Sequence, residues 1–87
     1  MKLLKFEAAW CGPCKMQTSV IKSLGNKITI PIEVIDVDEN LAMAKIYAVR
    51  GVPTLILLDD SGEEIKRNIG ALKEKDLLEF IKNDQEN

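Results

Sequence analysis

The 87-residue sequence predicts an α/β fold, in which a four-stranded mixed sheet is flanked by three helices. Segments with strand and helix periodicity alternate in the order β-α-β-α-β-β-α. Two strands joined by a helix imply parallel pairing through a right-handed crossover. Two late strands joined by a short polar turn imply an antiparallel hairpin. A third observation, a cysteine pair at the expected start of the first helix, suggests where the chemistry lies.

The first strand and the first helix show different periodicities. Residues 2–8 are apolar on both faces, so this strand is expected to lie centrally in the sheet. Residues 13–24 carry apolar side chains at helical spacing, and Gly25 supplies a stop. The apolar set of this helix consists of Met16, Val20, Ile21 and Leu24, and its polar set includes Lys15, Gln17, Thr18 and Lys22.

A second strand and helix follow. Residues 32–37 alternate β-branched and acidic side chains, a pattern typical of a strand. Asp38 is then a good N-cap for a helix over residues 41–48. These segments complete the first β-α-β-α half of the fold.

The second half is expected to contain a hairpin and a closing helix. Residues 54–58 form a short apolar strand, and residues 64–69 form a half-exposed strand after an Asp-Asp-Ser-Gly turn. The last helix is expected over residues 73–83, with Leu77, Leu78 and Ile81 facing inward.

Composition and charge exclude several classes of protein. At this length, with 46% hydrophobic and 30% charged residues, residues 1–87 are expected to form one globular domain. No apolar run approaches the roughly 20 residues of a membrane span. A net charge of −2 without a basic stripe excludes nucleic acid as a partner. Because the N-terminus lacks a signal-peptide segment, we expect a cytoplasmic protein whose partners are proteins.

Both cysteines lie in the segment Trp10-Cys11-Gly12-Pro13-Cys14-Lys15. Pro13 fixes φ inside the expected helix start, which places Cys11 at the first turn and Cys14 one turn later, with both sulfurs on one side. Two cysteines in a reducing cytoplasm indicate catalysis or metal binding. Because a helix N-terminus favours a thiolate, Cys11 is the expected nucleophile and Cys14 the resolving thiol.

Three motifs together resemble the thioredoxin family. They are the cysteine segment, Arg50-Gly51-Val52-Pro53-Thr54 before the hairpin, and Gly70-Ala71-Leu72 after the last strand. The resemblance covers nearly the whole chain and implies a thioredoxin fold without the N-terminal strand and helix of full-length thioredoxins. It also implies a protein-disulfide reductase that works by dithiol-disulfide exchange, with no metal and no cofactor beyond the redox-active Cys11–Cys14 disulfide.

The same resemblance implies partners and a cellular role. The partners would be a thioredoxin reductase or an equivalent electron donor, and target proteins that contain disulfides. The protein would act as a monomer in electron transport and cell redox homeostasis.

The resemblance also implies roles for individual residues. Cys11 resembles an exposed attacking thiol and Cys14 a buried resolving thiol. Gly12 and Pro13 between them are similar to the reducing members of the family, and Pro53 resembles the family's cis-proline. The apolar substrate-binding rim would consist of Trp10, Val52, Pro53, Gly70 and Ala71, with Trp10 at the surface rather than in the core.

Lys5 departs from the family pattern. It stands where thioredoxins hold a buried aspartate beneath the active site, and Val34 stands where they hold the lysine that pairs with it. Lys5 is either a solvated lysine without a catalytic part or a support of the active site. In the second case its amine would pair with Glu7 or Asp36 and favour the thiolates.

Two other functions are compatible with a CxxC motif. A metal-binding module could take two zinc ligands from the cysteines. The chain has no histidine and no further cysteine, so carboxylates or a second chain would have to complete that site. A non-catalytic docking module is the other alternative, although docking alone requires neither thiol.

Overall fold

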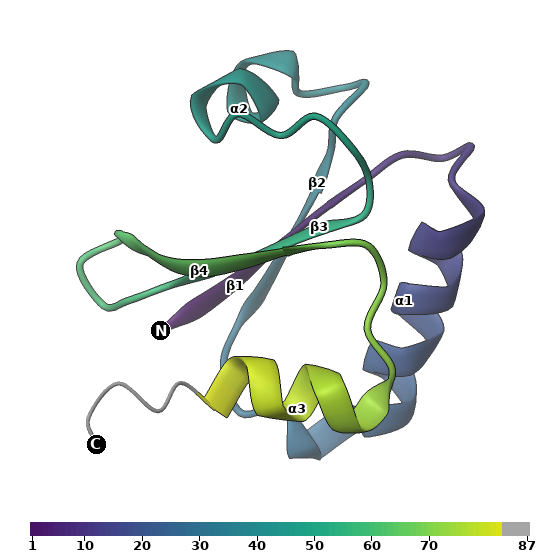
Figure 1. Ribbon diagram of the computed structural model, residues 1–87, viewed down its shortest axis with the longest axis vertical. Helices are drawn as coiled ribbons and strands as arrows, with labels where there is room; N and C mark the ends of the chain where they lie inside the picture. The colour runs from purple at the N-terminus through teal and green to yellow at the C-terminus, as the bar shows by residue number, and fades with distance from the viewer. Residues whose placement is uncertain (83–87) are drawn as a thin grey trace.

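The computed structural model describes residues 1–82, which fold in the predicted order of strands and helices (Figure 1). The elements are β1 (Lys2–Glu7), α1 (Gly12–Leu24), a 3₁₀ turn η1 (Gly25–Lys27), β2 (Ile32–Asp36), α2 (Leu41–Ile46), β3 (Thr54–Leu58), β4 (Glu64–Ile69) and α3 (Glu74–Lys82). The sequence therefore predicted every strand and α-helix of the described part, with differences only at the ends.

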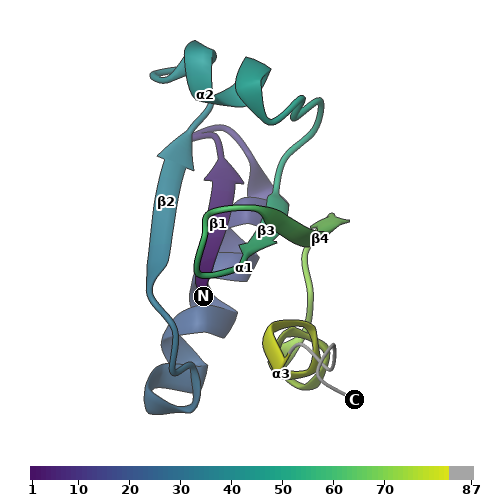
Figure 2. The same cartoon turned by 90° about the vertical axis from the view of Figure 1, so that its left-hand side faces the viewer.

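The four strands form one mixed sheet in the order β2-β1-β3-β4 (Figure 2). Strand β1 pairs in parallel with β2 and antiparallel with β3, and β3 pairs antiparallel with β4. The central position of β1 confirms the expectation from its two apolar faces. Because β1 and β2 are parallel, their carboxyl ends meet at one edge, and the cysteine segment follows β1 there.

Helices cover both faces of the sheet, with α1 and α3 on one face and α2 on the other (Figure 1). Successive residues of a strand point to opposite faces, so β1 and β3 supply side chains to both layers. The layer under α1 and α3 contains Leu3, Leu24, Leu55, Leu57, Leu77 and Ile81. The layer under α2 contains Leu4, Phe6, Ile35, Ile56 and Leu58. These two layers cover both faces of β1, the strand that leads into the cysteine segment.

Helix α1 differs from the prediction at two neighbouring positions. The helical spacing predicts Met16 in the apolar set, but its side chain is exposed, whereas the polar Gln17 is 0% exposed. Gln17 Oε1 accepts from the backbone N–H of Leu72 at 2.7 Å, and Gln17 Nε2 donates to the Leu72 carbonyl at 3.1 Å. Position 17 faces the segment between β4 and α3, whose backbone groups need partners outside a sheet. Burial here is decided by hydrogen bonding.

The start of α2 also differs from the prediction. The N-cap is Asn40, whose Oδ1 accepts from the backbone N–H of Met43 at 3.2 Å, so the assignment of Asp38 as the cap was wrong. An intervening turn separates β2 from α2 and moves Asp38 away from the helix. The helix ends at Ile46, two residues earlier than expected, and α3 begins at Glu74 rather than residue 73. The expected end at residue 83 lies outside the described residues.

Side-chain hydrogen bonds hold the β3–β4 hairpin at its turn and on its outer strand. Asp59 Oδ1 accepts from the backbone N–H and the hydroxyl of Ser61, and the bond from the hydroxyl is the main cause that lowers the pKa of Asp59. On β4, Arg67 pairs with Glu64 and donates to the backbone carbonyl of Tyr47 at 2.8 Å. The side-chain bond to Arg67 lowers the pKa of Glu64. Arg67 thereby ties β4 to the end of α2.

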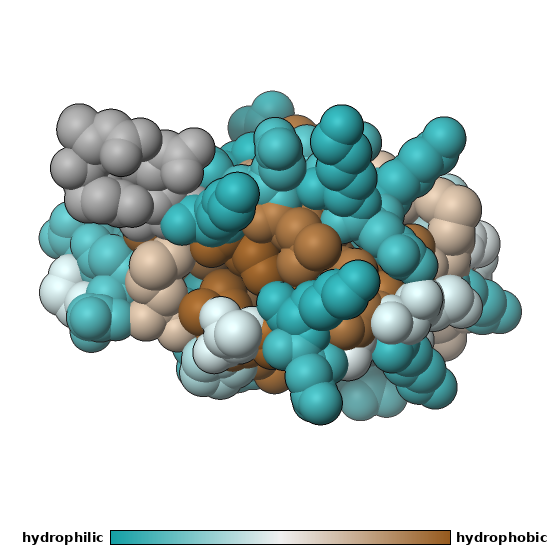
Figure 3. Space-filling model, turned by 90° about the horizontal axis from the view of Figure 1, so that it is seen from below, coloured by the Kyte–Doolittle hydropathy of each residue, from teal (hydrophilic) through white to brown (hydrophobic). Residues whose placement is uncertain are grey.

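The underside of the molecule, formed by α3 and the end of α1, carries apolar side chains framed by hydrophilic ones (Figure 3). Leu24 and Leu78 line a hollow there, between the lysines at positions 27, 75 and 82. Within residues 1–82, no helix has the length and apolar composition that crossing a membrane requires.

Candidate active site

The two cysteines form a disulfide at the N-terminus of α1. Cys11 is the N-cap, Pro13 lies in the first turn, and the Cα atoms of Cys11 and Cys14 are 5.2 Å apart. The backbone N–H of Cys14 donates to Cys11 Sγ at 3.1 Å. The expected placement of both sulfurs on one side of the helix start is confirmed. An N–H aimed at this sulfur stabilises negative charge on Cys11 when the disulfide is open.

Cys11 is more buried than expected. Its exposed fraction is 3%, and that of Cys14 is 2%, whereas the resemblance implied one exposed and one buried cysteine. Cys11 and Cys14 form a buried cluster with Ala8, and the partly buried Val37 and Val52 pack against this cluster. In this oxidised state the two cysteines therefore differ in their place on the helix rather than in exposure.

A small apolar groove of about 120 Å³ lies beside the disulfide. It is lined by Trp10, Val37, Val49, Arg50, Gly51 and Val52. Two of these residues, Val37 and Val52, also pack against the cluster of Ala8 and the two cysteines, so the groove adjoins that cluster. Trp10 is 71% exposed, which confirms its expected place at the surface. Its Nε1 donates to Asp38 Oδ2 at 2.8 Å, and this bond holds the ring at the groove.

The second and third motifs meet at the ends of β3 and β4. The Val52–Pro53 peptide bond is cis, as the resemblance implied. The backbone N–H of Gly70 donates to the Pro53 carbonyl at 2.8 Å, and Gly70 has a φ of +104°, which favours glycine. Ala71 follows it and is half-buried. The structure thus brings Val52, Pro53 and Gly70 together at the cysteine end of the sheet.

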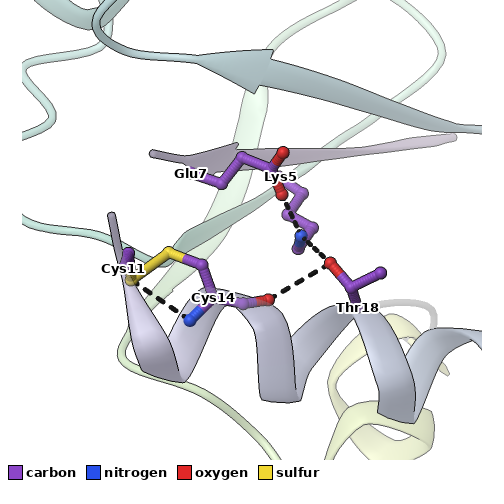
Figure 4. A network of polar contacts seen from close by, with 5 residues as sticks. All are labelled: Lys5, Glu7, Cys11, Cys14 and Thr18. Atoms are coloured by element: carbon purple, nitrogen blue, oxygen red, sulfur yellow. Dashed lines mark hydrogen bonds and ion pairs between the residues drawn. A yellow bond between two sulfur atoms is a disulfide. The ribbon is translucent and has the colours of Figure 1, made fainter. Parts of the chain in front are cut away.

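Lys5 lies between β1 and α1 and is 1% exposed, so of the two alternatives the solvated lysine is wrong (Figure 4). Its Nζ forms an ion pair with Glu7 and donates to Thr18 Oγ1 at 2.6 Å. Thr18 Oγ1 in turn donates to the backbone carbonyl of Cys14 at 3.2 Å. Of the two partners considered, Lys5 takes Glu7. Asp36 instead accepts hydrogen bonds from the backbone of the turn after β2.

The sequence did not identify Thr18, Val37 or Arg50 as part of the site. Thr18 had a usable signal, because it follows Cys14 by four residues and so shares its face of the helix. Val37 and Arg50 come from different loops and reach the groove only through the fold. The side-chain type of Val37 carried no signal of this role, and Arg50 was noted only as part of the second motif, without a role at the site. Among residues 1–82, no group of three or more His, Cys, Asp and Glu side chains could hold a metal ion.

Comparisons with known proteins agree with this geometry. The family model for thioredoxin matches residues 1–83. A thioredoxin of Chlamydia trachomatis serovar D is 44% identical over 77 residues, which cover 87% of this chain and 74% of the relative. The SPbeta prophage-derived thioredoxin-like protein YosR of Bacillus subtilis is 38% identical over 82 residues, which cover 94% of this chain and 96% of that relative. A solved mutant thioredoxin from Halobacterium salinarum, 43% identical, matches with a TM-score of 0.85 over 93% of this chain and 71% of its own.

Proposed function

Because the chain belongs to the thioredoxin family of thiol-disulfide oxidoreductases, we propose that Cys11 attacks the substrate disulfide and that Cys14 resolves the mixed disulfide. The chain is a protein-disulfide reductase, and the Cys11–Cys14 disulfide at the start of α1 carries that conclusion. The N–H of Cys14 that donates to Cys11 Sγ supports the first assignment, because it favours a thiolate on Cys11.

The reaction needs two exchanges of sulfur bonds. The Cys11 thiolate attacks one sulfur of the target disulfide, whose S–S bond breaks, and the other target sulfur leaves as a thiolate. The Cys14 thiolate then attacks Cys11 Sγ and breaks the mixed disulfide, which releases the second target sulfur. The target gains two electrons, and the chain is left with the disulfide seen in the structure. Gly12 and Pro13 support the site by setting the spacing of the two sulfurs.

The target is proposed to bind on a rim around the disulfide, formed by Trp10, Val52, Pro53, Gly70 and Ala71. The exposure of Trp10 and the apolar groove that it shares with Val52 support this assignment. The hydrogen bond between Gly70 and Pro53 places these two residues side by side. Ala71 is included because it follows Gly70 directly.

A second turnover requires an external reductant, since the first one leaves the chain oxidised. We therefore assign a thioredoxin reductase or an equivalent donor as one partner and disulfide-containing proteins as the others. A cytoplasmic location fits this role, because electron donors of that kind keep thiols reduced in the cytoplasm. We further propose that the chain acts as a monomer.

Reduction of insulin by dithiothreitol tests the two cysteine roles. The wild type should accelerate the precipitation of reduced insulin, and Cys11→Ser and Cys14→Ser should each lose this acceleration by about 100-fold or more. Only Cys14→Ser should accumulate a mixed disulfide, detected by mass spectrometry and located at Cys11. Trapping on Cys14 in the Cys11→Ser variant would reverse the assignment, and full turnover by either variant would refute it.

A further inference from the structure

A buried charge pair lies under the Cys14 end of the active site. The Lys5 side chain is 2% exposed and that of its partner Glu7 is 29% exposed. Taking an ammonium out of water is costly unless a carboxylate and further hydrogen bonds compensate it. Lys5 has both, because Glu7 neutralises it and Thr18 accepts its hydrogen bond. The molecule therefore retains a charge in a place where an apolar side chain would pack at lower cost.

The two charges of the Lys5–Glu7 pair are placed differently relative to Cys14. Glu7 and Lys5 are two residues apart on β1, so their side chains leave the same face of the strand. The Lys5 side chain reaches from there to α1, where Thr18 links its Nζ to the carbonyl of Cys14 (Figure 4). The ammonium is thus the end of the pair that touches the helix of Cys14, and Glu7 is the end that reaches solvent.

Building on the proposed role of Cys14 as the resolving thiol, we propose that Lys5 and Glu7 are positioning residues that tune its ionisation in opposite senses. The ammonium of Lys5 favours the Cys14 thiolate, which forms when the thiol releases its proton to solvent. The carboxylate of Glu7 holds the ammonium under α1 and limits its effect. A low local dielectric strengthens both influences relative to those of surface charges.

The other charged side chains at this end of the molecule are already hydrogen-bonded or are exposed to solvent. Asp38 accepts from Trp10, and Asp36 accepts from the backbone N–H groups of residues 38 and 39. Lys15 is exposed on α1, and Arg50 is exposed at the groove. Lys5 and Glu7 are the charged pair linked to Cys14 by hydrogen bonds in the described residues.

The rate of the resolving step against pH tests this proposal. Reduced protein is mixed with an aromatic disulfide that yields a coloured thiolate, and the second release of colour in stopped flow reports the attack of Cys14 on Cys11. The midpoint of the rate profile should rise by about one pH unit in Lys5→Met and fall by about half a unit in Glu7→Gln. The double variant should lie between the two single variants.

The exposed pair Lys2–Glu33 supplies a matched control. Lys2→Met and Glu33→Gln make the same charge changes at a pair in which each side chain is 44% exposed. Their midpoints should stay within about 0.2 pH units of the wild type, because water and salt screen them. If Glu7→Gln alone does not fold, the comparison is made between Lys5→Met and the double variant, where adding Glu7→Gln must lower the midpoint.

Shifts of the same sign in Lys5→Met and Glu7→Gln, or no shift in either, would overturn the proposal. So would shifts of equal size in the control pair. These outcomes leave the cysteine roles intact as long as Cys14→Ser still loses insulin turnover. Turnover that survives in Cys14→Ser would instead refute the proposed function on which the pair's role depends.

Discussion

Strand β1 carries two lysines that each pair with a glutamate, in very different surroundings. Lys2 pairs with Glu33 of the neighbouring strand β2 at 2.5 Å, and both side chains are 44% exposed. Lys5 pairs with Glu7 under helix α1, where the lysine side chain is 2% exposed. Only the second pair is extended by a threonine to the backbone of a cysteine.

The difference between the two pairs shows that the stability cost of a charged side chain depends on its burial. An exposed pair gains roughly 0 to 1 kcal/mol, because water competes for both charges and screens them. Breaking a buried pair leaves one charge without compensation and costs several times more. A fold gains little from a buried pair that apolar side chains could replace. Its presence beside the disulfide therefore points to function rather than to stability.

Loss of the Glu7 carboxylate should have the largest effect on stability. Glu7→Gln leaves the Lys5 ammonium buried without a counter-charge, so the free energy of unfolding should fall by about 2 to 3 kcal/mol. The partial exposure of Glu7 keeps this below the cost at a fully buried pair. Urea unfolding of Glu7→Gln and of its control Glu33→Gln measures the contrast. Equal losses in the two variants would remove the distinction between the pairs.

The neutral buried side chain of Gln17 should show how much of the stability lost in Glu7→Gln comes from the uncompensated charge. Gln17 is as buried as Lys5, but it satisfies only the backbone N–H and carbonyl of Leu72. Gln17→Met should lower the free energy of unfolding by about 1.5 kcal/mol, because both backbone groups lose a partner. A loss larger than that of Glu7→Gln, measured in the same urea titrations, would mean that burial matters more than charge.

The partly exposed Arg67–Glu64 pair should give an intermediate, pH-dependent effect. Arg67→Met should cost about 0.5 to 1 kcal/mol at pH 7. In the folded state the hydrogen bond from Arg67 lowers the pKa of Glu64, so the pair's stabilisation is present above the unfolded value of about 4.3 and is lost as the pH falls through the folded pKa.

The stability difference between the wild type and Arg67→Met should therefore shrink as the pH is lowered from 7 to 3. The bond from Arg67 to the Tyr47 carbonyl does not titrate in this range and should leave a residual difference. Thermal unfolding at the two pH values measures it. A difference that grows toward pH 3 would contradict the assigned cause.

The exposed pair on β1 should give the smallest effect. Lys2→Met should change the free energy of unfolding by less than about 0.5 kcal/mol at low salt. Since screening shortens the range of surface charges, 0.5 M sodium chloride should reduce even this change. Urea titrations at the two salt concentrations test the expectation. A salt-independent loss of more than 1 kcal/mol would show that Lys2 acts through packing instead.

Much of the fold was predictable because it follows from local patterns. The two apolar faces of residues 2–8 placed β1 in the middle of the sheet, and an apolar strand followed by a polar turn indicated the hairpin. Gly25 ended α1 as expected, with a φ of +51°. Each of these features depends on neighbours within a few residues, and the sequence contains those neighbours explicitly.

The predictions from the sequence were wrong where a side chain contacts residues that are distant in the sequence. Met16 and Gln17 exchange their expected exposure because the backbone of Leu72 lies opposite position 17. Asp38 bonds the indole of Trp10 instead of capping α2. The same limit applies to the site, where Lys5 could have pointed to solvent or to either of two carboxylates. No pattern within β1 distinguishes those choices.

The sequence by itself determined the order of elements and the two cysteines at a helix start, because spacing and periodicity decide these locally. Only the tertiary structure decided the burial of Cys11, the groove beside Trp10 and the pairing of Lys5 with Glu7 beneath α1. The physical reason is that burial and charge pairing depend on which surfaces the packed elements bring together. The chain's sequence order does not show those surfaces.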